Sequence, residues 1–154
     1  MVPSQYAHVC EQLHARIAAA FRDVGVDPAR LRLVAMQPHA GFLGLVQGAT
    51  ALLDTLGFSG GNTSIDAIAV GTPIVTLPGA TMRARQTAAM LRGIGVADGV
   101  AADEAGYVAQ AVAFADGGAR RDAASRLAAA APALFDQPDS IAALGELLWQ
   151  ETST

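Results

Sequence analysis

Residues 50 to 79 read TALLDTLGFSGGNTSIDAIAVGTPIVTLPG, and this stretch decides the fold class of the chain. The run TALLDT (50 to 55) is typical of a buried strand, LGFSGG forms a loop, and residues 62 to 70 have a helical pattern. Gly71-Thr72-Pro73 ends that helix, and IVTLP (74 to 78) is the most strand-like run of the sequence. The order of these elements predicts a β-α-β unit with parallel strands.

The same alternation extends in both directions along the chain. Upstream, the pattern predicts a helix over 6 to 24 that ends at Gly25, a strand in LRLVAM (31 to 36) and a short helix from Pro38 to about Gln47. Downstream, it predicts a helix from Thr81 to about Arg92, a weaker strand in VADGVAA (96 to 102), and helices at 103 to 115, 118 to 131 and 138 to 151. We therefore expect an α/β fold, a Rossmann-like parallel sheet with flanking helices, as a single lobe over residues 1 to 154, with C-terminal helices at about 103 to 151.

Composition narrows the class of protein. The 154 residues suffice for one domain, and the 52% of hydrophobic residues are dispersed, with no unbroken membrane span. A net charge of −4 with scattered arginines argues against nucleic acid as a partner. A single cysteine, Cys10, excludes an internal disulfide, and the N-terminus lacks a secretory signal pattern. These features predict a soluble, cytoplasmic protein with no membrane partner.

Ligands of open α/β sheets bind beyond the carboxyl ends of the strands, which directs attention to three loops: 37 to 42, 56 to 64 and 79 to 86. The middle loop joins a strand directly to a helix through Gly60 and Gly61. Two glycines allow close backbone approach, and the helix start can bind an anion together with the hydroxyls of Thr63 and Ser64. No cluster has metal-ligand spacing and no Ser-His-Asp arrangement can be built, so we expect neither a metal nor a cofactor.

Three polar side chains of the predicted helix at 62 to 70 share one face. Asn62 lies four residues before Asp66 and Thr63 lies three before it, and a carboxylate one turn inside a phosphate-binding helix start suits a ribose. The competing interpretation is a helix capped by Asn62 or Thr63, with Asp66 interacting with the helix dipole. Asp54, at the end of its strand, is interpreted as a support for the loop.

The motifs LDT (53 to 55), GGNTSID (60 to 66) and GTPIVTLPG (71 to 79), together with Arg85, resemble the signature of glycosyltransferase family 41. This family contains the O-GlcNAc transferases and SPINDLY-like enzymes, whose catalytic region has two Rossmann-like lobes in the GT-B arrangement. The resemblance covers roughly residues 8 to 150, and the GGNTS form is typical of bacterial members. It implies that the chain is the C-terminal catalytic lobe, apparently truncated at its N-terminus.

The resemblance also implies a set of donor-binding residues. In such a site Gly61, Asn62 and Thr63 lie against the donor diphosphate and Asp66 binds the ribose of a uridine nucleotide, which makes UDP-GlcNAc the first candidate donor. The chain departs from the animal enzymes, which have His-Thr-Thr at 61 to 63, and Phe42 stands where relatives present a His. The full set implied by the resemblance is Gln37, Pro38, His39, Phe42, Gly60, Gly61, Asn62, Thr63, Asp66 and Arg85, while the catalytic residues stay unassigned.

The same resemblance implies what else a complete enzyme needs. Family members carry an N-terminal catalytic lobe, usually preceded by tetratricopeptide repeats, and an inverting transfer requires groups from both lobes to converge. We therefore expect a UDP-sugar donor and that lobe or repeat region as partners, and an isolated chain that is inactive. Two alternatives are a stand-alone nucleotide-binding module that performs no transfer, and a homodimer that pairs an open sheet edge.

Overall fold

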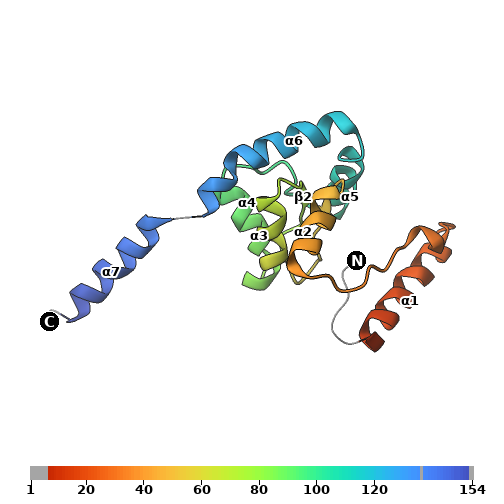
Figure 1. Ribbon diagram of the computed structural model, residues 1–154, viewed down its shortest axis with the longest axis horizontal. Coiled ribbons are helices and arrows are strands. Elements are labelled where there is room, and N and C mark those ends of the chain that lie inside the picture. Colours follow the sequence, from red (N-terminus) through yellow and green to blue (C-terminus); the bar gives the residue numbers. More distant parts are fainter. Residues whose placement is uncertain (1–6, 136, 153–154) are drawn as a thin grey trace. The chain divides into compact units, whose positions relative to one another are not determined.

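The computed structural model describes residues 7–135 and 137–152. The chain divides into two compact units, one reaching to Phe42 and the other beginning at Leu43. Figure 1 shows helix α1 of the first unit, and strand β2 with helices α3 to α6 of the second. Because each unit is compact in its own right, each is described by itself.

The first unit begins with helix α1 (Ala7–Asp23), which buries Cys10 and Ala18. The predicted helix over 6 to 24 is thus confirmed apart from Tyr6, which lies outside the described residues. Gly25 ends the helix with a φ of 73°, and its N–H donates to the carbonyl oxygen of Arg22 at 3.0 Å. This left-handed conformation suits glycine, which has no Cβ to clash.

The prediction of a strand in LRLVAM (31 to 36) is wrong. After the short 3-10 helix η1 (Pro28–Arg30), residues 31 to 38 have no regular secondary structure. A strand needs a neighbour to satisfy its N–H and C=O groups, and no ladder partner for this run exists among the described residues. Leu33 and Met36 are accordingly 39% and 56% exposed.

The second unit is built around a small parallel sheet. Strand β1 (Leu52–Leu53) pairs with β2 (Ile74–Val75), Leu52 lying opposite Ile74. Thr76 continues β2 as a parallel bridge to Val100, so the weak strand predicted at 96 to 102 is reduced to one bridging residue. The predicted parallel arrangement is confirmed, with shorter strands than the sequence indicated.

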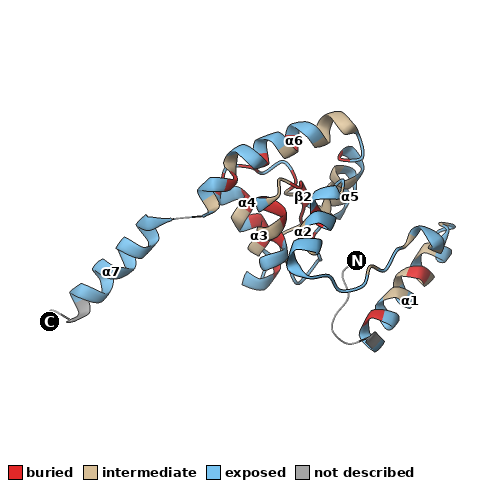
Figure 2. Cartoon of the chain, viewed as in Figure 1, coloured by how far each residue is buried: buried red, intermediate tan, exposed pale blue. Residues whose placement is uncertain are grey.

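Helices surround this sheet at the predicted places. Helix α2 (His39–Gly48) precedes β1, α3 (Asn62–Ala69) connects β1 to β2, and η2 (Met82–Ala84) with α4 (Gln86–Gly93) follows β2. Helices α5 (Glu104–Ala113) and α6 (Gly117–Ala130) and the 3-10 helix η3 (Ala131–Leu134) come after Val100. Val75, Phe114 and Ala123 form a buried cluster that connects β2 with the later helices. Figure 2 shows buried stretches, in red, on β2 and α3.

The last described helix is α7 (Pro138–Thr152). Its large apolar side chains are exposed, among them Ile141 and Trp149 at 75% each. No helix within the described ranges is long and apolar enough to cross a membrane.

Candidate functional site

The loops that follow β1 and β2 meet at the carboxyl end of the sheet. The backbone N–H of Ser59 donates to the carbonyl oxygen of Arg83 at 2.8 Å, which joins the two loops directly. Within the second loop, Gly79 N–H donates to the Ala84 carbonyl at 2.9 Å, and a Cβ on Gly79 would lie 2.7 Å from the Ala84 Cβ. Two of the three predicted ligand loops therefore form one structure.

Asp54 organises the first of these loops. Its side chain is 6% exposed, and its Oδ1 accepts from the N–H groups of Gly60 at 2.7 Å and Thr55 at 3.0 Å. Its Oδ2 accepts from the hydroxyls of Ser59 and Thr76, each at 2.7 Å. An ionised carboxylate only accepts hydrogen bonds, so four donors satisfy it fully. The interpretation of Asp54 as a support for the loop is confirmed by these contacts.

A group of buried hydroxyls connects this carboxylate to the two helices that follow the loops. The Ser59 hydroxyl lies 2.7 Å from both Asp54 Oδ2 and Thr87 Oγ1, and the Ser64 hydroxyl lies 2.7 Å from Thr87 Oγ1 as well. Ser59, Ser64 and Thr87 are each at most 1% exposed. The first turns of α3 and α4 are thereby tied to the loop after β1.

The hydroxyl of Ser64 is used differently from the sequence prediction, which placed it with Thr63 in an anion site. Ser64 is fully buried and bonded to Thr87, whereas Thr63 is exposed at the start of α3. Successive residues of an α-helix are rotated by about 100° around its axis, so adjacent side chains point in different directions. The prediction for Ser64 is therefore wrong.

The start of α3 is open to solvent. Gly61 is the N-cap residue and supplies no side-chain hydrogen bond, and the first turn contains no acidic residue. The first helical bonds are those from Ser64 and Ile65 to the Gly61 carbonyl, so the N–H groups before them have no partner within the helix. Capping by Asn62 or Thr63 is thus not what the structure shows. Asn62 and Thr63 are exposed, and Asp66 is half-buried one turn later.

Gly60 has a structural role in addition to the predicted one, which is to allow close approach of the backbone to a ligand. Its N–H is bound by Asp54 Oδ1, and a Cβ at this position would lie 2.5 Å from the Ser64 Oγ. Gly61 is less constrained, since its Cβ would meet only the flexible end of Gln86 at 3.2 Å. The glycine at 60 therefore lets the loop pack on α3.

Two arginines flank the helix starts. Arg85 connects η2 to α4 and is exposed. Arg83 lies with its guanidinium carbon 5.9 Å from the ring centroid of Phe58, within the range of a cation–π contact. Arg83 thus interacts across the two joined loops, which the sequence did not indicate.

The remaining predicted site residues, at 37 to 42, belong to the first unit. Gln37 Nε2 donates to the Ala35 carbonyl at 2.9 Å, His39 begins α2, and Phe42 N–H donates to the Pro38 carbonyl at 2.9 Å. Gln37, Pro38 and His39 are exposed and Phe42 is half-buried. Their part in a ligand site stays a prediction.

Sequence reasoning missed four residues that shape the site: Ser59, Thr76, Thr87 and Tyr107. The Tyr107 hydroxyl donates to the Asp54 carbonyl oxygen at 2.9 Å, although the two residues lie 53 positions apart. Burial, and to a lesser extent the charge of Asp54, raise the pKa of Tyr107 above its ordinary value of 10.0. Single hydroxyl residues have no spacing that marks them, so the sequence offered no signal for these contacts.

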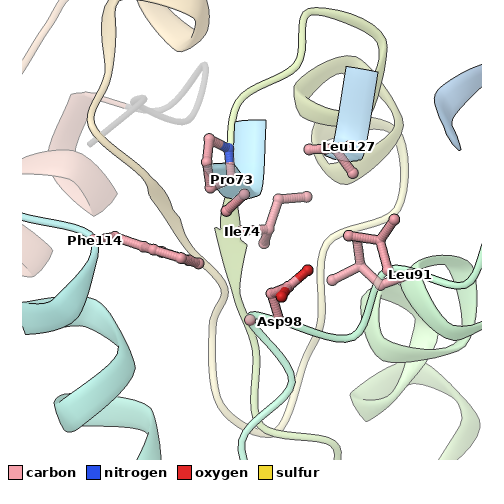
Figure 3. A pocket seen from close by; sticks show the side chains of 9 residues that line it. Pro73, Ile74, Leu91, Asp98, Phe114 and Leu127 are labelled. Atoms are coloured by element: carbon pink, nitrogen blue, oxygen red, sulfur yellow. The ribbon is translucent and has the colours of Figure 1, made fainter. Parts of the chain in front are cut away.

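One small hollow lies elsewhere in the second unit, where β2 begins. Figure 3 shows Pro73, Ile74, Leu91, Asp98, Phe114 and Leu127 around it. Its volume of ≈ 10 Å³ holds about one water molecule, and its lining is mostly apolar.

In the described part of the chain, no three His, Cys, Asp or Glu residues are grouped to hold a metal ion. The candidate site is therefore the pair of joined loops at the other end of β2.

The small parallel sheet with its flanking helices matches the GT-B catalytic region of glycosyltransferases. Within that class, the chain belongs to glycosyl transferase family 41, whose profile matches residues 7–131 and runs through both units.

A solved structure supports the same assignment. The chain is similar to a mutant of the Thermobaculum terrenum O-GlcNAc transferase, with 28% sequence identity and a TM-score of 0.77. The similarity covers 90% of this chain and 27% of that chain, so the present chain spans about a quarter of its relative. No curated protein matches.

Proposed function

We propose that this chain is the donor-binding lobe of a protein O-glycosyltransferase and that it binds the nucleotide of a UDP-sugar, with UDP-GlcNAc as the first candidate. The observation that carries the proposal is the open start of α3, directly after a glycine-rich loop whose position is fixed by Asp54. A helix start presents N–H groups and a partial positive charge, which together favour a phosphate.

The local charges agree with an anionic ligand. The first turn of α3 has no acidic side chain, and the buried carboxylate of Asp54 has its lone pairs occupied by four donors. The exposed Arg85 is the N-cap residue of the neighbouring helix α4, whose first turn also contains no acidic residue. A diphosphate next to Gly61, Asn62 and Thr63 would therefore meet backbone N–H donors and no acidic side chain in the first turn of α3.

Further roles follow from the family resemblance. Asp66, one turn after Asn62, would accept hydrogen bonds from the ribose hydroxyls, and Gln37, Pro38, His39 and Phe42 would border the base. Transfer would require an acceptor hydroxyl and a second lobe, because an inverting displacement brings donor, acceptor and base together in one place. We propose the N-terminal catalytic lobe of the family as that partner.

Calorimetric titration of the chain with UDP, and with ADP as a base control, tests the proposal. We expect UDP to bind, ADP to bind more weakly, and Asp66→Ala to weaken UDP binding about tenfold, equivalent to ~1.4 kcal/mol. Asp122→Ala, which removes an exposed carboxylate from α6, serves as the matched control and should leave the affinity unchanged. Absence of UDP binding at about millimolar concentration, or equal loss in both variants, would refute the proposal.

A further inference from the structure

One buried threonine contacts both the loop after β1 and the first turn of α3. Thr87, in the first turn of α4, is 0% exposed, and its Oγ1 lies 2.7 Å from the hydroxyls of Ser59 and Ser64. It also donates to the Gly60 carbonyl oxygen at 3.2 Å, and its N–H donates to the Ser59 Oγ at 3.0 Å. We propose that Thr87 is a positioning residue that holds residues 60 to 63 in the conformation that receives the donor diphosphate, an inference that rests on the proposed function.

The contacts of Gly60 show how the position is fixed. Its N–H is held by Asp54 and its carbonyl oxygen by Thr87, so both polar groups of its backbone are bound. The next residue, Gly61, is the N-cap of α3 and carries no side chain to restrain it. The orientation of the open N–H groups at the start of α3 therefore depends on Gly60. Within the described ranges, the backbone of Gly60 is hydrogen-bonded only by Asp54 and Thr87.

Removing the Thr87 hydroxyl would leave several groups without their partner. The Ser64 hydroxyl and the Gly60 carbonyl would both lose a hydrogen bond, and Ser64 is fully buried. Unsatisfied buried polar groups are unfavourable, so the loop would shift toward solvent to recover hydrogen bonds. That shift would displace residues 60 to 63, which are the residues proposed to contact phosphate.

Thr72 provides a matched control within the same unit. It is also a buried threonine, 3% exposed, and its hydroxyl donates to the Val46 carbonyl of α2 at 2.9 Å. It shares no hydrogen-bond partner with Thr87 among the described residues. Thr72→Val therefore removes a buried hydroxyl of the same kind without touching the loop after β1.

The experiment compares Thr87→Val, Thr87→Ser and Thr72→Val by amide hydrogen exchange in the absence of ligand. We expect Thr87→Val to accelerate exchange of the hydrogen-bonded Gly60 and Ile65 amides, which report on the two sides of residues 61 to 63, about tenfold, the loss of one buried hydrogen bond, and Thr87→Ser to restore it to within about threefold. Thr72→Val should leave those amides within about twofold of the wild-type rate once global stability is accounted for. Ser64→Ala removes one partner of the same hydroxyl and should act in the same direction if Thr87→Val does not fold.

UDP titration of the same proteins completes the test. Thr87→Val should weaken UDP binding about tenfold, with Thr87→Ser close to wild type and Thr72→Val unchanged. Unchanged exchange of the Gly60 and Ile65 amides in both Thr87→Val and Ser64→Ala, or an equal effect of Thr72→Val, would overturn the role of Thr87. A wild-type chain that fails to bind UDP would instead overturn the proposed function, while the exchange rates still decide whether Thr87 holds the loop.

Discussion

The hydroxyl of Tyr107 donates a hydrogen bond to the carbonyl oxygen of Asp54, 2.9 Å away. Asp54 directly follows β1, and Tyr107 lies in the first turn of α5, which comes after the bridge at Val100. The contact therefore joins the carboxyl end of one edge of the sheet to the helix that follows its other edge. It also holds the first turn of α5 against Asp54, the residue that organises the candidate site.

Tyr107→Phe removes this hydrogen bond while it keeps the ring. We expect the free energy of unfolding to fall by about 1 kcal/mol, the usual net contribution of one hydrogen bond. Urea denaturation followed by circular dichroism measures this change. A variant as stable as the wild type would show that the Asp54 carbonyl finds an equivalent partner in water.

The pH dependence of the same pair follows from the raised pKa of Tyr107. Folding favours the neutral phenol, so the stabilisation is fully present below the ordinary value of 10.0 and is lost as pH rises through the higher pKa of the folded chain. Denaturation curves above about pH 9.5 should therefore show a steeper loss of stability for the wild type than for Tyr107→Phe. Parallel curves for the two proteins would contradict the assigned contact.

Asp54→Asn replaces an acceptor with an NH₂ group that faces hydrogen-bond donors. The NH₂ group would face either the two backbone N–H donors or the Ser59 and Thr76 hydroxyls, which would have to turn and accept. Buried hydrogen bonds are lost in both cases, and we expect a loss of about 2–4 kcal/mol in the free energy of unfolding. The matched control is Asp116→Asn at the start of α6, where Asp116 accepts from Gly118 N–H and Asn caps equally well. Equal stability of the two variants would contradict the claim that the Asp54 carboxylate holds the loop after β1.

Gly99 is the position where the sheet tolerates no side chain. A Cβ there would overlap the Ile74 carbonyl oxygen and lie 2.8 Å from the Ile74 carbonyl carbon, and backbone atoms of β2 cannot move aside as a flexible side chain can. We expect Gly99→Ala to destabilise the chain by more than about 2 kcal/mol, measured by thermal unfolding. Gly93→Ala, at a site with no atom within 4 Å, should instead be neutral or stabilising by up to about 1 kcal/mol.

The sequence predicted the helices and the order of the parallel strands because both rest on local signals. Residues 62 to 70 and 74 to 78 have periodicities and stop signals that the structure reproduces as α3 and β2. Gly60-Gly61 likewise marked the loop at the sheet end. LRLVAM was misleading because its apolar residues favour a strand, whereas strand formation depends on a distant partner that a local pattern does not report.

The buried hydroxyls of the site were beyond the reach of such reasoning. Ser59 and Thr87 are 28 positions apart, and neither residue type in isolation indicates burial. Ser64 was assigned to a ligand for the same reason, since a hydroxyl at a helix start suits an anion and an inward hydrogen bond equally well. Only the three-dimensional arrangement distinguishes the two.

The most direct test of the central claim is an amide ¹H–¹⁵N NMR titration of the chain with UDP and, separately, with uridine. If the diphosphate binds at the start of α3, UDP should shift the amide resonances of Gly61, Asn62 and Thr63 in a saturable manner, and uridine, which lacks phosphate, should leave these three nearly unchanged. Saturable shifts from UDP that spare Gly61 to Thr63, or no shifts at all, would contradict the account.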